Sequence, residues 1–139
     1  MRLVLDTNIV ISGLLWNGPP RRLIDSAIGG TVNLYTSAVL IAELREALAY
    51  AKFAKRIATN GETVDRCIRR FMAIASLTAA ARIESTGSAD PDDEHVIACA
   101  LAAQADLIVS GDAHLLDLKS YRRIPILTAS AALAIIVSG

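Results

Sequence analysis

The chain has 139 residues, of which 53% are hydrophobic and 20% charged. This balance is typical of one globular domain with a buried core and excludes a disordered chain. Fourteen basic and fourteen acidic residues give a net charge of zero, which excludes a strongly basic protein that binds any polyanion. Apolar stretches are all shorter than the roughly 18 residues of a membrane span, and Asp6 interrupts the first of them. We therefore expect a cytoplasmic protein with no membrane association and no secretory signal.

The first half of the chain shows strand-like and helix-like segments in alternation. Short runs rich in Leu and Val favour strands, and Ser37 is a residue type that caps helices. The predicted elements are a strand at 2–5 followed by a turn at Asp6-Thr7-Asn8, a helix at 21–29, a strand at 32–36, a helix from Ser37 to about residue 50, a short helical piece at 52–57 and a helix at 62–76.

The second half continues this alternation. The predicted elements are a strand within 77–84, a polar loop at 85–90, a buried helix at 92–104, a strand at 106–110, a short helix at 112–118, a strand at 124–128 and a closing helix at 129–137. Such alternation predicts a three-layer α/β/α sandwich with a mostly parallel central sheet. Because we find no repeat and no linker, we expect residues 1–139 to form a single domain. Cys67 and Cys99 lack metal-ligand spacing and are expected to be buried thiols.

Acidic residues follow the predicted strands at the end where open parallel sheets bind ligands. Asp6 comes directly after the first strand, and Asp112 lies two residues beyond the strand at 106–110. Glu43 lies on the helix that leaves the second strand, on the flank of its apolar stripe. The acids at 92–94 open the helix that leads into the strand at 106–110. Four separate segments therefore place carboxylates at one edge of the sheet.

Carboxylates that are buried within a few ångströms of one another repel unless a cation lies among them. Mg²⁺ or Mn²⁺ fits such a site, because hard cations prefer oxygen ligands. The spacing of His95 and His114 does not predict a zinc site, and we expect both to be surface or capping residues. Each acid also has a structural interpretation, as a turn, helix-capping or salt-bridged residue. A structural role for all four acidic segments at once is much harder to sustain.

Three blocks of the sequence resemble those of the PIN-domain nucleases, in the same order. They are LVLDTNIVISGLL at the start, TSAVLIAELREAL, and DPDDEHVIACALAAQADLIVSGDAHLL. The third block is most similar to bacterial PIN-family toxin components, and the chain resembles VapC-type toxins more distantly. The resemblance extends from residue 1 to about 127. It implies a PIN-like fold and a ribonuclease that hydrolyses RNA phosphodiesters with Mg²⁺ or Mn²⁺.

The resemblance also assigns roles to individual residues. It implies that Asp6, Glu43, Asp112 and an acid of the pair Asp93-Glu94 hold the metal and form the catalytic site. An ungapped count from the SGD motif places Glu94 where many relatives have Asp, so Glu94 is favoured and Asp93 is kept as the alternative. Adjacent helical residues point about 100° apart, so the two side chains cannot point the same way. Further candidates, for orienting an acid or a phosphate oxygen, are Thr7, Asn8 and Ser37.

Partners are implied by the resemblance alone. A toxin component is expected to have a small antitoxin partner, which would insert a basic side chain or a helix at the acidic pocket, and to form a homodimer. The glutamate at the third acidic position keeps a second interpretation open. In that alternative, the chain is a non-catalytic nucleic-acid- or protein-binding module on a PIN fold with a degraded metal site.

Overall fold

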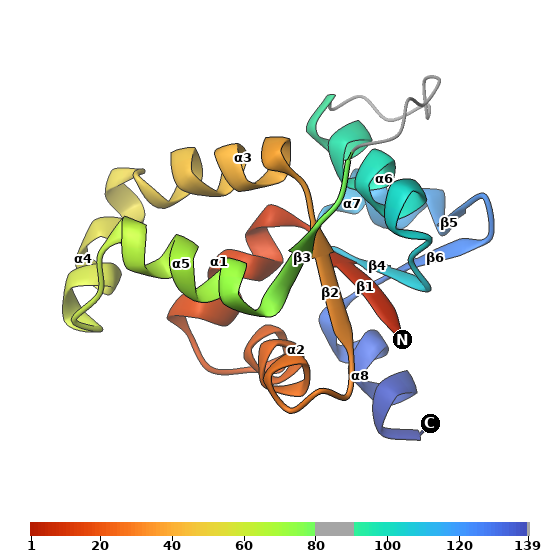
Figure 1. Ribbon diagram of the computed structural model, residues 1–139, viewed down its shortest axis with the longest axis horizontal. Helices are drawn as coiled ribbons and strands as arrows, with labels where there is room; N and C mark the ends of the chain where they lie inside the picture. Colours follow the sequence, from red (N-terminus) through yellow and green to blue (C-terminus); the bar gives the residue numbers. More distant parts are fainter. Residues whose placement is uncertain (80–90, 139) are drawn as a thin grey trace.

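A central six-stranded sheet forms the middle layer of the protein (Figure 1). The computed structural model describes residues 1–79 and 91–138. The strands are β1 (Arg2–Leu5), β2 (Asn33–Thr36), β3 (Ala75–Leu77), β4 (Leu107–Val109), β5 (Ser120–Tyr121) and β6 (Ile124–Leu127). Their order across the sheet is β3-β2-β1-β4-β6-β5, and every pair is parallel except β5 with β6.

Helices cover both faces of this sheet. They are α1 (Thr7–Leu15), α2 (Pro19–Ile28), α3 (Ala38–Leu48), α4 (Ala51–Thr59), α5 (Val64–Ile74), α6 (Pro91–Ala103), α7 (Ala113–Leu118) and α8 (Ala129–Ser138). The protein is thus a three-layer α/β/α sandwich with a mostly parallel sheet, which confirms the predicted fold class.

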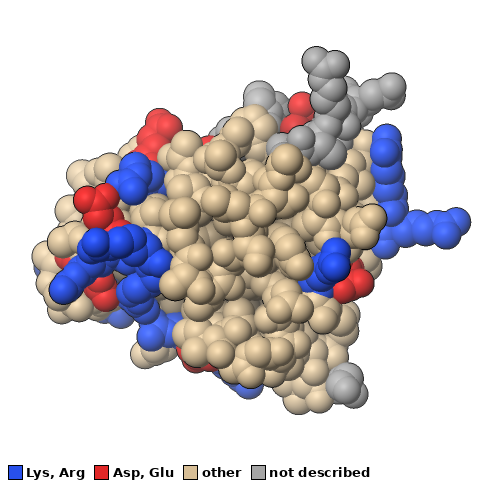
Figure 2. Space-filling model, viewed as in Figure 1, with Lys and Arg blue, Asp and Glu red and all other residues tan. Residues whose placement is uncertain are grey.

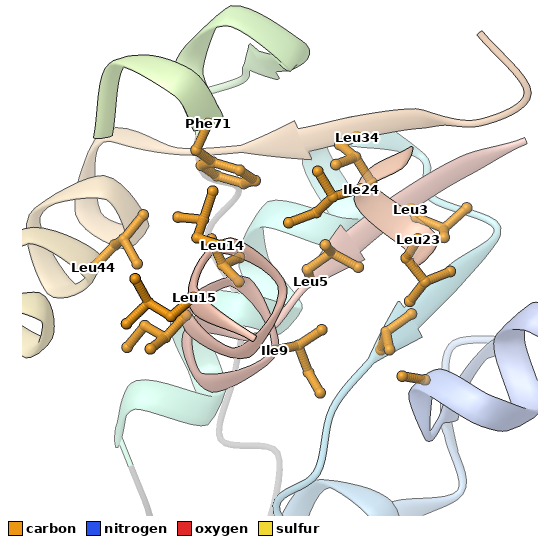
Figure 3. Packing of buried hydrophobic residues seen from close by; sticks show 14 of the residues in the cluster. Leu3, Leu5, Ile9, Leu14, Leu15, Leu23, Ile24, Leu34, Leu44 and Phe71 are labelled. Carbon is orange, nitrogen blue, oxygen red and sulfur yellow. The ribbon is translucent and has the colours of Figure 1, made fainter. Parts of the chain in front are cut away.

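Strand β1 shows why a short sequence specifies two cores. Successive side chains of a strand point to opposite faces, so Leu3 and Leu5 join one apolar cluster while Val4 joins the other. All three side chains are buried, as expected for a strand covered by helices on both faces. The first cluster is filled from α1, α2, α5 and α8, and Figure 3 shows its side chains closing around α1. The second is filled mainly from α6 and α7.

Close packing fixes α1 against α2. A β-carbon at Gly13 would lie 2.5 Å from a side-chain carbon of Ile24 and 2.9 Å from the carbonyl oxygen of Pro20. Only glycine lets the two helices approach this closely, so the axis of α1 is held firmly in the core. This matters for the site, since the two ends of α1 lie beside two different pockets.

Several predicted boundaries were wrong. The turn predicted at Asp6-Thr7-Asn8 is instead the start of α1, because Asp6 is extended and acts as the N-cap residue. The helix predicted at 62–76 ends at Ile74, and β3 begins earlier than expected because pairing with β2 draws Ala75–Leu77 into the sheet. The two-residue β5 was not predicted. The loop at 85–90 and the end of the strand predicted within 77–84 lie outside the described residues.

Candidate functional site

The carboxyl ends of β1 and β4 border a pocket of about 370 Å³. Asp6 follows β1 and begins α1, while Asp112 follows β4 and begins α7. Two more acids reach the pocket from helices, Glu43 from α3 and Asp93 from α6. The residues that line the pocket are Asp6, Thr7, Asn8, Glu43, Glu46, Ala47, Tyr50, Asp93 and Asp112. Acids from four separate segments therefore meet at one edge of the sheet.

A buried serine holds the two strand-end acids in place. The hydroxyl of Ser110, which is 0% exposed, donates a hydrogen bond of 2.8 Å to Oδ2 of Asp6. The hydroxyl oxygen of Ser110 in turn accepts a hydrogen bond of 2.9 Å from the backbone N–H of Asp112. The backbone N–H of Asp6 donates to the carbonyl oxygen of Val109 at 2.9 Å and so continues the pairing of β1 with β4. Asp6 and Asp112 are thus fixed by the sheet itself.

The electrostatics of Asp6 favour a bound cation. Burial is the main reason why the pKa of Asp6 is raised above its ordinary value of 3.8, and the nearby charges of Asp93 and Asp112 raise it further. Hydrogen bonds from the Ser110 hydroxyl and the Thr7 backbone lower the pKa of Asp6 and only partly offset these effects. A positive ion among these carboxylates would relieve both the burial penalty and the repulsion.

Glu43 is held by a side chain of another helix. Nδ1 of His95, on α6, lies 2.5 Å from Oε1 of Glu43, on α3. The Glu43 side chain is 21% exposed and that of His95 is 42% exposed, so the pair is partly shielded from water. His95 was expected to be a surface or capping residue, but it contacts a predicted site acid.

The adjacent acids Asp93 and Glu94 occupy different environments. Asp93 is 3% exposed and lines the pocket, whereas Glu94 is half-buried and is not among the lining residues. The turn of about 100° between neighbouring helical residues separates the two side chains. The structure therefore places the alternative candidate Asp93, not the favoured Glu94, beside Asp6 and Asp112.

Comparison with known proteins gives the family. Residues 2–114 match the PIN domain family. The chain belongs to this family. Its fold is similar to that of VapBC2 from Rickettsia felis bound to a DNA fragment from their promoter, with a TM-score of 0.58 and 13% identity over 91% of this chain and 97% of that chain. It is also similar to FitAcB from Neisseria gonorrhoeae, with a TM-score of 0.56 and 19% identity over 92% and 98%. No curated protein matches the sequence.

The match confirms the predicted resemblance to the PIN family, whose members are nucleases. The residues outside the four acids divide into two groups. Thr7 and Asn8 line the pocket of this PIN domain. Ser37 instead caps α3, where its buried hydroxyl accepts a hydrogen bond of 3.3 Å from the backbone N–H of Leu40. The structure thus brings Thr7 and Asn8 to the site and leaves Ser37 outside the lining.

Sequence reasoning missed several residues at or beside the PIN site, among them His95. Glu46 lies three positions after Glu43 and so on the same side of α3, which is a spacing that could have revealed it. The position of Ser110, a polar residue at the end of an apolar strand, was also visible. Tyr50 lies seven positions after Glu43, and His114 lies two positions after Asp112, so these spacings were also visible, although only the folded chain shows that both residues reach the pocket region.

The donor set fits a hard cation. Ligand atoms of Asp93, Asp112 and His114 lie within 4.8 Å of one another, close enough to hold one ion. Two of these three ligand atoms are carboxylate oxygens, the ligands that Mg²⁺ and Mn²⁺ prefer, and the third is a ring nitrogen of His114. Asp93 is 3% exposed, so it lies in the buried part of this donor set. Among the described helices, none is long and apolar enough to cross a membrane.

Proposed function

We propose that residues 1–139 form a single PIN domain that acts as a metal-dependent endoribonuclease, the toxin of a toxin–antitoxin pair. The observation that carries this proposal is the convergence of Asp6, Glu43, Asp93 and Asp112 on one pocket, with the pKa of Asp6 raised by burial and by its acidic neighbours. Perturbed carboxylates in a cleft are a common sign of an active site. The family match favours hydrolysis of a phosphodiester.

The four acids would hold Mg²⁺ or Mn²⁺. When bound, such an ion lowers the pKa of a coordinated water and stabilises the charge that develops on the phosphate. Ser110 orients Asp6 through its hydroxyl, and His95 orients Glu43 through its ring nitrogen. Of the acids in the pocket, one would accept the proton that the attacking water loses.

Thr7 and Asn8 would bind a phosphate oxygen of the substrate. Both line the pocket at the first turn of α1, where backbone N–H groups and the helix dipole favour negative charge. Asn8 is exposed, and its amide is a hydrogen-bond donor that a phosphate can reach. These groups would position the scissile bond above the carboxylates.

We expect a small antitoxin protein to cover this pocket with a basic side chain or a helix, because an acidic pocket is complementary to a cation. The folds of two toxin–antitoxin proteins resemble that of the chain. We also expect a homodimer, and the exposed apolar side chains of Ile135 (43%) and Val137 (75%) on α8 offer contact surface for it. Copurification with the product of an adjacent small reading frame tests the antitoxin partner, and the mass of the purified protein in solution tests the homodimer.

Cleavage of RNA tests the proposal directly. A broad pool of labelled single-stranded RNA is incubated with purified protein and Mg²⁺ or Mn²⁺, and with Asp6→Asn. We expect metal-dependent cleavage that falls about a thousandfold or more in the variant, because a ligand acting on the transition state is lost. Asp117→Asn is the matched control, since Asp117 is an exposed acid of α7 outside the pocket lining.

An RNA pool left intact with both metals would contradict the nuclease proposal and favour the non-catalytic module. The sequence left that alternative open because it predicts a glutamate, Glu94, at the third acidic position. An aspartate, Asp93, lines the pocket at this place, so the proposed ligand set is that of an intact site.

A further inference from the structure

The positive charge of the chain is concentrated on one end of the molecule. Between residues 45 and 70, seven basic and three acidic residues give a net charge of +4, although the whole chain sums to zero. Figure 2 shows Lys and Arg side chains, with some Asp and Glu among them, gathered over α4 and α5, and others at the opposite end, while most of the face between them is uncharged. A local field of this kind attracts anions even when the protein as a whole is neutral.

Aromatic rings are interleaved with these cations. Nζ of Lys52 lies 5.0 Å from the centre of the Phe53 ring, and the guanidinium carbon of Arg56 lies 5.4 Å from the centre of the Trp16 ring. The Phe53 and Trp16 rings contact each other edge to face, 6.2 Å between centres. We call these four side chains, together with Tyr50 and the exposed Lys55 of α4, the aromatic–basic strip.

The strip keeps aromatic surface open to solvent. Trp16 is 39% exposed and Tyr50 is 51% exposed, although burial of an aromatic ring is strongly favourable. Exposed rings beside Lys and Arg are the arrangement by which proteins stack unpaired bases and hold the phosphates between them.

One end of the strip lies at a second pocket. This pocket, of about 360 Å³, is lined by Leu14, Leu15, Trp16, Asn17, Arg21, Arg56, Asn60, Glu62 and Arg70. Nε of Arg56 donates a hydrogen bond of 2.8 Å to the carbonyl oxygen of Leu15, and Nδ2 of Asn60 donates one of 3.2 Å to the same oxygen. These bonds fix a guanidinium group at the pocket before any ligand binds.

The other end of the strip lies at the acidic pocket. Tyr50 lines that pocket and is also the N-cap residue of α4, and its carbonyl oxygen accepts a hydrogen bond of 3.0 Å from the backbone N–H of Phe53. Helix α1 gives the separation of the two pockets, because its first turn borders one and its last residues border the other. Nine residues at 1.5 Å each make this about 14 Å, a length that a few nucleotides can span.

We propose that the aromatic–basic strip binds single-stranded RNA and leads it from the pocket at Arg56 to the acidic pocket. This inference rests on the proposed ribonuclease function and assigns the surface outside the acidic pocket that would hold the RNA. Unpaired RNA is specified by the rings, since bases can stack on Trp16 and Tyr50 only when they are not stacked in a duplex. Lys52, Lys55 and Arg56 would contact the phosphates.

Binding without cleavage tests this proposal. The full-length protein in EDTA is titrated against a labelled single-stranded RNA of mixed sequence, at several salt concentrations, and followed by fluorescence anisotropy. The double variant Lys52→Gln/Lys55→Gln is compared with Arg122→Gln/Arg123→Gln, which removes the same charge from two exposed arginines of the β5–β6 turn. The plot of log affinity against log salt should become shallower by about 1.4 in the first variant, at about 0.7 per lost phosphate contact, and should not change in the second.

A second pair of variants tests stacking. Trp16→Leu keeps apolar volume but removes the ring face, whereas Trp16→Phe keeps a ring. We expect RNA affinity to fall about tenfold in the leucine variant and to be largely retained in the phenylalanine variant. Thermal unfolding of each variant shows that the comparison is made between folded proteins.

The outcomes separate this inference from the nuclease proposal. Equal losses in the two charge variants, equal affinities of Trp16→Leu and wild type, or preference for a duplex of the same sequence would each overturn the inference. If wild type also cleaves RNA with Mg²⁺ while the strip variants keep its KM, the nuclease proposal stands alone. If wild type binds through the strip in EDTA but cleaves nothing with metal, the strip stands and the nuclease proposal fails.

Discussion

The two sides of the acidic pocket are built in different ways. On the strand side, Asp6 and Asp112 are held by the sheet, through the backbone pairing of β1 with β4 and through the buried hydroxyl of Ser110. On the helix side, Glu43 is held by His95, a side chain on another helix. A sheet edge gives fixed positions, whereas the helix side depends on how α3 and α6 pack. The positions of the strand-side acids therefore depend on backbone pairing together with one side chain, whereas the position of Glu43 depends on a contact between the side chains of two helices.

The comparison of the two sides is tested most strongly at the third acidic position, where the adjacent residues Asp93 and Glu94 lie in different environments. Asp93→Asn is expected to reduce metal-dependent RNA cleavage about a thousandfold, because a buried carboxylate at the pocket is lost. Glu94→Gln, one residue along the helix, is expected to change the rate less than about threefold. Initial cleavage rates at saturating metal measure both. A large loss in Glu94→Gln with none in Asp93→Asn would reverse the assignment.

Ser110 links the strand-side acids, and its removal has the next largest expected effect. In Ser110→Ala, Oδ2 of Asp6 loses a hydrogen bond of 2.8 Å and the backbone N–H of Asp112 loses one of 2.9 Å. Loss of a group that orients a metal ligand typically costs 10- to 100-fold in metal affinity or activity. Calorimetric titration with Mn²⁺ and cleavage rates should both show the loss. Unchanged Mn²⁺ affinity would mean that the sheet alone positions the two acids.

The same contrast explains what the sequence could predict. Asp6 and Asp112 follow apolar strands, and parallel strands of an open sheet present their carboxyl ends at one edge, so their meeting was predictable. Whether Asp93 or Glu94 enters the pocket depends on the rotation of α6 about its axis. That rotation is set by side chains packed from other segments, and α6 is apolar nearly all round, so its sequence shows no clear inward face.

Contacts between distant segments also explain why α1 and the roles of His95 and Ser110 were not predicted. Helix α1 was not predicted, because its residues TNIVISGLL are mostly buried and rich in β-branched types, which are less typical of helices than of strands. The role of His95 could not be predicted, since 52 residues separate it from Glu43. The polar strand end at Ser110 was visible in the sequence, but its hydroxyl shows its two partners only in the folded chain.

His95 tests the helix side with a smaller expected effect. In His95→Ala, Glu43 loses the contact of 2.5 Å with Nδ1, and we expect kcat to fall about tenfold and the affinity for Mn²⁺ to weaken. His95→Asn places an amide N–H close to the position of Nδ1 and should restore part of both. The KM for RNA should not change in either variant, since His95 is not among the residues that line the pocket. A fall in thermal stability with no change in Mn²⁺ affinity would make His95 a packing residue only.

The smallest expected effect is on stability without metal, and it isolates the charge of Asp6. The pKa of Asp6 is raised in the folded protein, mainly by burial, so between its ordinary value of 3.8 and its folded value the folded state binds more protons than the unfolded state. The free energy of unfolding therefore gains a contribution that is complete below the ordinary value and is lost as pH rises through the folded value. Asp6→Asn keeps an oxygen that can accept the Ser110 hydrogen bond but carries no charge. In EDTA, we expect its Tm at neutral pH to exceed that of wild type by a few degrees at most, and this difference to vanish in acid.

Added Mg²⁺ should raise the Tm of wild type and leave that of Asp6→Asn nearly unchanged, because a ligand stabilises only the state that binds it. If the Tm of Asp6→Asn shows the same pH dependence as wild type and rises equally with Mg²⁺, then Asp6 carries no destabilising buried charge and does not bind the cation.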